Sequence, residues 1–265
     1  MWNGRTVSVA LPTYNEKASI RDCIERFWAT GVVDQIVVCN NNAAPGTSEE
    51  VAKAGAQEVF ETRQGYGWSC RAALAETTGE LIVLCEPDGS FEPQDVFKLL
   101  AYAEDFEVVF GSRTNSATIW SGANMGRWMG WANWCVGKYI EVLFDTIALT
   151  DAGCTMRLVT RRVLDRVQPR FSVGGSHFGV EMTLLCLSRG ARAVEIPLNY
   201  KPRIGKSMVT GNRWVAVLLG LRMVWFVTRV RISSWLGLRP RGPDRGADQH
   251  PREPSTADRQ REAYV

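Results

Sequence analysis

Short runs of apolar residues alternate with amphipathic stretches through the first 115 residues of the chain. The runs have the length of buried strands, and they lie at residues 6–11, 35–39, 58–61, 81–85 and 107–110. Between them, apolar side chains recur with the period of a helix at residues 18–29, 47–54, 68–77 and 94–103. Strands that alternate with helices of this length predict βαβ units, so we expect an α/β fold with a doubly wound, mostly parallel sheet.

The pattern changes after residue 115. Residues 119–144 form a Trp- and Gly-rich stretch with helical character, followed by a predicted helix at 176–188 and a last strand at 194–197. Beyond residue 237 the chain is rich in Pro, Arg, Asp, Glu and Gln, a composition typical of a disordered tail. The predicted units are a globular domain over 1–212 with halves 1–115 and 116–212, a helix over 213–236 and a tail over 237–265.

Composition excludes several classes of protein. Hydrophobic residues make up 45% and charged residues 22% of the 265 residues, which is ordinary for a chain that buries a full core. A net charge of +3 is too small to call for nucleic acid as a partner. The seven cysteines are scattered without a C-x-x-C pair and there are only two histidines, so we expect neither a disulfide framework nor a zinc site.

Polar clusters follow four of the predicted strands, at residues 12–16, 40–42, 86–88 and 111–113. In a parallel sheet, ligands bind outside the carboxyl ends of the strands, so these clusters meet at one edge. Glu86 and Asp88 suit a hard cation, which takes oxygen ligands and keeps positions open for phosphates. Pro-Asp-Gly is also a common surface turn, but four clusters at one edge favour a binding site.

With these clusters in view, the chain resembles the family 2 glycosyltransferases of the GT-A fold. Within that family it looks most like the dolichol- or polyprenol-phosphate sugar (mannosyl or glucosyl) synthases. The resemblance rests on an ordered set of short motifs that spans roughly residues 6–210: LPTYNE (11–16), NNN (40–42), GYG (65–67), EPDGS (86–90), GSR (111–113), DAGCTMR (151–157) and RIGKS (203–207).

The resemblance implies a nucleotide-sugar-binding half at 1–115 and an acceptor-side half at 116–212. On the nucleotide side it implies binding by Pro12, Tyr14, Asn15, Glu16, Asn40 and Ser90. Asn40 stands where the family usually has Asp. Because Asn donates as well as accepts hydrogen bonds, the base is left open between uracil and guanine.

The remaining site residues are also implied by the resemblance. Glu86 and Asp88 match the family's D-x-D and would hold Mg²⁺ or Mn²⁺. The basic residues near the sugar, the diphosphate and the acceptor phosphate are Arg113, Arg127, Arg203 and Lys206. Asp151 matches an aspartate proposed as the base or as the group that orients the acceptor; a plain turn with Gly153 is the alternative.

The function that this implies is inverting transfer of a hexose from a GDP- or UDP-hexose to a polyprenyl (dolichyl-type) phosphate. Two alternatives stay open. One is transfer to a saccharide, a protein or a soluble acceptor, and the other is a degenerate GT-A module that binds without catalysis. Asn40 and Glu86 each stand where the family usually has Asp, and these two replacements favour the degenerate module. Asp88, Arg113 and the basic loop after the last strand favour an enzyme.

Residues 213–232 predict a contact with a membrane surface. The stretch is long enough to cross a bilayer, but an arginine in its middle costs about 2.5–3.5 kcal/mol on insertion scales. Arg222 lies near that middle, and Arg229 follows. Apolar bulk with basic residues at its edges suits a helix in the interface, and the Trp-rich stretch at 120–134 suits the same boundary. We therefore expect a peripheral protein on the cytoplasmic face of the membrane.

Overall fold

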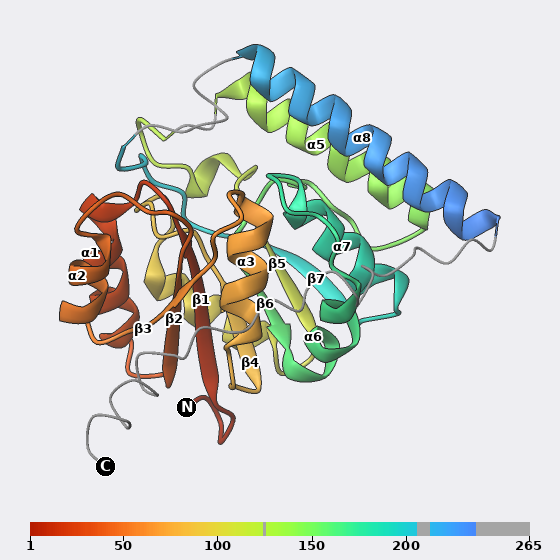
Figure 1. Cartoon of the computed structure of the whole chain (residues 1–265). Helices are drawn as coiled ribbons and strands as arrows, with labels where there is room; N and C mark the ends of the chain where they lie inside the picture. Colours follow the sequence, from red (N-terminus) through yellow and green to blue (C-terminus); the bar gives the residue numbers. More distant parts are fainter. Residues whose placement is uncertain (124–125, 206–212, 237–265) are drawn as a thin grey trace.

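The structure is a computed structural model, and it describes residues 1–123, 126–205 and 213–236 (Figure 1). A seven-stranded sheet in the order β3-β2-β1-β4-β6-β5-β7 forms the centre of the molecule. The strands are β1 (Val7–Thr13), β2 (Gln35–Asn40), β3 (Gln57–Phe60), β4 (Leu81–Leu84), β5 (Val108–Ser112), β6 (Arg157–Thr160) and β7 (Ala193–Pro197). All seven residues of β1 are buried, as expected for a central strand with neighbours on both sides and helices on both faces.

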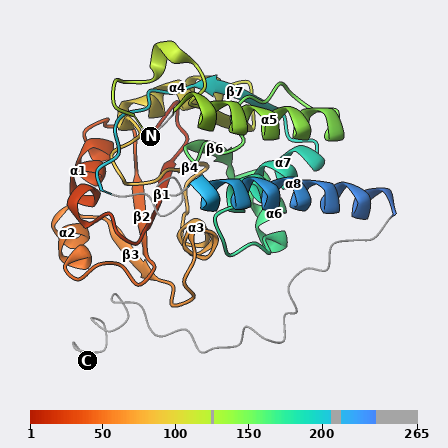
Figure 2. The ribbon, with the colours of Figure 1, turned by 90° about the horizontal axis from the view of Figure 1, so that it is seen from above.

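Helices cover both faces of the sheet (Figures 1 and 2). The core on one face includes buried side chains of α1, α2 and α4, and the core on the other face includes those of α3, α5, α6, α7 and α8. The helices are α1 (Lys17–Trp28), α2 (Thr47–Lys53), α3 (Tyr66–Ala75), α4 (Val96–Tyr102), α5 (Arg127–Phe144), α6 (Arg161–Val167), α7 (Phe178–Ser188) and α8 (Arg213–Trp235). Single 3₁₀ turns lie at Pro93–Asp95, Ser116–Thr118 and Gln168–Arg170.

The two longest helices, α5 and α8, lie side by side in an outer layer (Figures 1 and 2). Val136 and Ile140 of α5 and Met223 and Val227 of α8 are buried in the core beneath them. The hydroxyls of Tyr139 and Thr228 share a hydrogen bond of 2.8 Å between the two helices. In the part of the chain that the structure describes, no helix is long and apolar enough to cross a membrane.

The α/β class and the mostly parallel sheet are confirmed, and the order of the first five strands and four helices agrees with the sequence pattern. The structure adds a strand, β6, which runs antiparallel between β4 and β5, and the short helix α6 that follows it. The Trp-rich helix begins at Arg127 and not at residue 119. The predicted tail at 237–265 lies outside the described residues.

Candidate active site

A cavity of about 440 Å³ opens at the carboxyl ends of the parallel strands. Pro12, Glu16, Glu86 and Arg113 line it, each from a segment that follows β1, β4 or β5 or from the strand end itself. The cavity also reaches the outer layer, where its lining includes Met129 and Asn133 of α5 and Leu219 and Met223 of α8. The structure thus brings residues of all four predicted strand-end clusters together and adds a wall made by the two outer helices.

Glu16 organises the segment after β1. Its Oε2 accepts hydrogen bonds from the backbone N–H of Tyr14 at 2.7 Å and of Asn15 at 2.9 Å. Tyr14 and Glu16 line the cavity together with Pro12, as predicted, while Asn15 is exposed and does not belong to the lining. Three of the four nucleotide-side residues expected in this segment therefore form one wall of the cavity.

The cluster after β2 contributes to the cavity through a different asparagine from the predicted one. The amide of Asn40 donates to the Ser48 hydroxyl and the Glu58 carboxylate at 3.1 and 3.0 Å, and Asn40 is outside the cavity lining. Asn41 lines the cavity, and its Oδ1 accepts a hydrogen bond from the backbone N–H of Gly65 at 2.9 Å. The nucleotide contact expected of Asn40 therefore stays a prediction, and the structure adds Asn41 as a residue of the cavity.

The turn after β4 holds Asp88 beneath the cavity. Asp88 is 1% exposed, and its Oδ1 accepts hydrogen bonds from the backbone N–H and the hydroxyl of Ser90 at 2.8 and 2.5 Å. Gly89 has a φ of +77°, a conformation that side chains rarely adopt. Ser90 therefore acts by fixing Asp88, and its hydroxyl is directed at this carboxylate and not at the cavity.

Glu86 is the carboxylate of this turn that lines the cavity. Burial, followed by the negative charge of Asp88, raises the pKa of Glu86 to about 8. The nearby charges of Arg203 and Arg113 lower it only in part. A buried carboxylate beside a second carboxylate fits a divalent cation, because such an ion stabilises their ionised forms. No cluster of three or more His, Cys, Asp or Glu side chains exists within the described residues, so the other ligands would come from elsewhere.

Arg203 lies across the acidic side of the cavity. Its Nε is 3.2 Å from Oδ2 of Asp88, and its Nη2 donates to Oε1 of Glu16 at 3.1 Å. Burial opposes its charge, yet the carboxylates of Asp88, Glu86 and Glu16 raise the pKa of Arg203 above its ordinary value. Lys206, the other basic residue expected here, lies outside the described residues.

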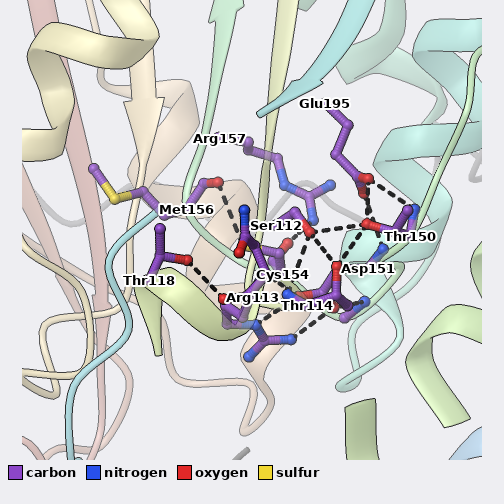
Figure 3. Close-up of polar contacts among 12 residues, drawn as sticks. Ser112, Arg113, Thr114, Thr118, Thr150, Asp151, Cys154, Met156, Arg157 and Glu195 are labelled. Carbon is purple, nitrogen blue, oxygen red and sulfur yellow. Dashed lines mark hydrogen bonds and ion pairs between the residues drawn. The ribbon is translucent and has the colours of Figure 1, made fainter. Parts of the chain in front are cut away.

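Arg113 reaches the cavity from the end of β5, held by a buried carboxylate (Figure 3). Its Nε and Nη2 donate to the two oxygens of Asp151 at 2.9 and 3.0 Å, and its backbone N–H adds a bond of 2.8 Å. The guanidinium also lies 5.2 Å from the ring centre of Tyr200. Burial opposes the charge, but Asp151 raises the pKa of Arg113 well above its ordinary value.

Asp151 is itself fixed by a further acid, Glu195 (Figure 3). Glu195 on β7 accepts hydrogen bonds from the N–H of Asp151 at 2.9 Å and from the N–H and hydroxyl of Thr150 at 2.7 and 2.6 Å. The Asp151 side chain has no exposed surface, and both of its oxygens are engaged. In this arrangement Asp151 orients Arg113, and its expected role as a base or as the group that orients the acceptor stays a prediction.

Glu195, Thr150 and Asn41 were not predicted as site residues from the sequence. One signal was visible, because a glutamate inside the predicted strand at 194–197 is unusual in a buried position unless it has partners. Arg127 is the first residue of α5, and its side chain lies outside what the structure describes.

The seven-stranded, mostly parallel sheet with helices on both faces, and with an acidic turn and two arginines at its carboxyl edge, agrees with the GT-A class of glycosyltransferase folds. Residues 8–168 match the model of the family described as glycosyl transferase family 2. The match covers more than half of the chain, so the protein belongs to this family.

Individual relatives agree with the family. The chain is 26% identical over 209 residues to the low-salt glycan biosynthesis hexosyltransferase Agl6 of Haloferax volcanii, covering 76% of this chain and 49% of that protein. The chain therefore spans about half the length of this relative. It is 28% identical over 213 residues to an uncharacterized glycosyltransferase of Mycobacterium tuberculosis, covering 79% of this chain and 92% of the relative.

Solved structures share the fold. The glucosyl-3-phosphoglycerate synthase of Mycobacterium tuberculosis, in complex with Mn²⁺, UDP and glucosyl-3-phosphoglycerate, superposes with a TM-score of 0.64 at 19% identity. The alignment covers 92% of this chain and 82% of the synthase. A complex of the same synthase with Mg²⁺ and UDP gives a TM-score of 0.63. At this identity the likeness establishes the fold alone.

Proposed function

We propose that the protein transfers a hexose from a nucleotide-diphosphate sugar to a polyprenyl phosphate held at a membrane surface. The observation that carries this proposal is the reach of the cavity. Its lining includes the charged residues Glu86 and Arg113 and also the apolar residues Leu219 and Met223 of α8. Charged groups for a sugar diphosphate and apolar groups from an outer helix suit a donor and a lipid-linked acceptor in one cavity.

The charged residues suit the donor. Glu86 and Asp88 would hold Mg²⁺ or Mn²⁺, which when bound stabilises the charge on a leaving diphosphate as a Lewis acid. Support comes from the structural relatives, whose complexes contain Mn²⁺ or Mg²⁺ with UDP. Asp151 engages Nε and one N–H of Nη2 of Arg113, and the remaining N–H groups of this guanidinium would bind a phosphate.

The buried position of Asp151 suits a phosphate acceptor. A phosphate monoester loses its last proton near pH 6, so its oxygen attacks C1 of the hexose without a protein base. The new bond forms between that oxygen and C1 while the bond from C1 to the diphosphate oxygen breaks, and the nucleoside diphosphate leaves with the electron pair. A hydroxyl acceptor would instead need a base within reach. Asp151 has no exposed surface with which to serve as one.

The outer faces of α5 and α8 suit a membrane surface as the site of the reaction. Trp128, Trp131 and Trp134 on α5 are exposed, and so are Leu221 and Trp225 on α8. Such large apolar side chains on neighbouring outer helices exceed what a surface in water usually presents. Tryptophan favours the boundary between lipid and water, and exposed basic residues near it favour anionic lipids.

Arg222 and Arg229 are exposed on the same helix as Trp225, and Arg229 lies 5.5 Å from the ring centre of Trp225. We place the protein on the cytoplasmic face of the membrane as a peripheral enzyme. Carbonate at high pH is expected to release it from membranes; retention together with protection from protease on the far side would contradict a peripheral position.

The acceptor is tested with washed membranes and a panel of labelled UDP- and GDP-hexoses. Label that becomes extractable into organic solvent, dependent on Mn²⁺ or Mg²⁺ and on one nucleotide sugar, supports the proposal. Label that stays water-soluble and appears only with a small phosphorylated acceptor, such as a phosphoglycerate, would replace the lipid acceptor by a soluble one. Nucleotide binding without any transfer would point to a degenerate module.

A further inference from the structure

Both oxygens of Asp88 are engaged inside the protein. Oδ1 accepts two hydrogen bonds from Ser90, and Oδ2 faces the guanidinium of Arg203 at 3.2 Å. The same guanidinium reaches Glu16 at 3.1 Å, so one cationic side chain joins the segment after β1 to the turn after β4. Arg203 is therefore an internal cation at the carboxylate that belongs to the candidate metal site.

Residues 200–205 carry Arg203 and are here called the strap. The strap lies along the turn that holds Asp88. The backbone N–H of Lys201 donates to the carbonyl of Ser90, and that of Ile204 donates to the carbonyl of Asp88, both at 2.8 Å. The Ile204 side chain covers Gly89, where an added Cβ would lie 2.9 Å from it. A small set of contacts thus holds the strap, and with it Arg203, against the turn. Ile204 is 47% exposed, so little buried apolar surface opposes local opening of the strap.

We propose that Arg203 and a divalent cation exclude each other at Asp88, so that cation binding releases Arg203 to bind the diphosphate of the donor. This inference rests on the metal-dependent transfer proposed above. A metal ligand distance near 2.0–2.1 Å leaves no room for a guanidinium on the same carboxylate oxygen, and the two positive charges repel. The freed guanidinium keeps its planar fork of donors, which fits a diphosphate better than a single carboxylate oxygen.

The exchange predicts opposite effects of one substitution on two binding steps. In Arg203→Gln, the competing charge at Asp88 is gone, so Mn²⁺ alone should bind about tenfold more tightly than to the wild type, an order-of-magnitude figure that corresponds to about 1.4 kcal/mol. The nucleoside diphosphate, added with saturating Mn²⁺, should bind more weakly because a phosphate contact is lost. A residue with a merely structural role would shift both affinities in the same direction or neither.

Lys201→Gln supplies the matched control. Lys201 lies on the same strap and loses the same charge, but its amine pairs with Glu92 and not with Asp88. Any effect of net charge or of a loosened strap should therefore appear in Lys201→Gln as well, while relief of competition should appear only in Arg203→Gln.

The experiment is a titration of the full chain with Mn²⁺, in which electron paramagnetic resonance measures the free ion at each step. It is done first without nucleotide and then with UDP or GDP. Limited proteolysis with trypsin adds a second measurement. The bond from Arg203 to Ile204 should be cut faster when Mn²⁺ is present, whereas the bond after Lys201 precedes Pro202 and resists trypsin.

The inference is supported if Mn²⁺ binds more tightly to Arg203→Gln than to both the wild type and Lys201→Gln, and if Mn²⁺ speeds cleavage at Arg203. Equal Mn²⁺ affinity in all three proteins, with binding present, overturns the exchange and leaves the metal site intact. Absence of Mn²⁺ binding in all three, with and without nucleotide, overturns the metal part of the proposed function together with the exchange.

Discussion

Replacement of Asp151 by Asn separates two roles that the same residue has been given. As a base, Asp151 would act on an acceptor hydroxyl, and its loss would lower kcat by about 10²–10⁴-fold with little effect on stability. In the structure it holds Arg113 instead, through hydrogen bonds of 2.9 and 3.0 Å to the guanidinium and 2.8 Å to the backbone. The two roles predict different measurements.

The magnitude follows from burial. Side-chain exposure is 0% for Asp151 and 11% for Arg113, so the pair is almost fully shielded from water. Breaking a buried pair by removing one charge typically costs about 3–5 kcal/mol, because the remaining charge is left uncompensated. The new amide of Asn would also direct N–H groups at the guanidinium. For a domain of this size the cost corresponds to a fall in Tm on the order of 10 °C.

The assay is thermal unfolding of the wild type, Asp151→Asn, Arg113→Gln and the double variant. We expect the double variant to lose less stability than the two single variants lose in sum, because each side chain compensates the charge of the other. Nucleotide-sugar affinity should fall in both Asp151→Asn and Arg113→Gln. An unchanged Tm and unchanged nucleotide binding in Asp151→Asn, with turnover abolished, would refute this reasoning and restore the base.

Three further predictions follow from the acidic turn and the outer helices. Asp88→Asn should abolish transfer with the circular dichroism spectrum unchanged; full activity in the variant, or in excess chelator, would exclude the metal site. Because the folded-state pKa of Glu86 is about 8, above its ordinary 4.5, the folded protein holds a proton there that the unfolded chain releases, so stability falls as pH rises through that window. In chelator at pH 8.5, Glu86→Gln should therefore increase the free energy of unfolding by roughly 1–2 kcal/mol after solvent screening, and so raise Tm, whereas near pH 5 it should match the wild type. Equal Tm values for the variant and the wild type at both pH values would refute the raised pKa. Trp131 is 62% exposed, so Trp131→Ser should weaken sedimentation with anionic vesicles several-fold without lowering Tm, and unaltered sedimentation would count against a membrane face.

The arrangement of the sheet edge was predictable because the signals are local. Four apolar runs of strand length ended in a polar cluster, and parallel strands place such ends together. Glu86, Arg113 and the wall after β1 were found in this way, and the structure places all of them on one cavity.

The partners of these residues were not predictable, because they depend on contacts distant in the sequence. Asp151 is separated from Arg113 by 38 residues, and Glu195 from Asp151 by 44. The antiparallel strand β6 lies between β4 and β5 and is part of the sheet that brings these residues together. The sequence of a four-residue strand does not indicate which strands it pairs with or in which direction. The preference for Asn41 over Asn40 depends on which of two adjacent side chains faces the cavity, which a one-residue change in register reverses.

The proposed acceptor is tested most directly by one comparison with purified protein. Vesicles contain either a polyprenyl phosphate or the matching polyprenol without phosphate, and each receives Mn²⁺ and the labelled nucleotide sugar. We expect label to enter the organic phase with the polyprenyl phosphate and not with the polyprenol, together with release of one nucleoside diphosphate for each hexose transferred. Transfer to the polyprenol, or transfer only to water-soluble acceptors under the same conditions, would contradict it.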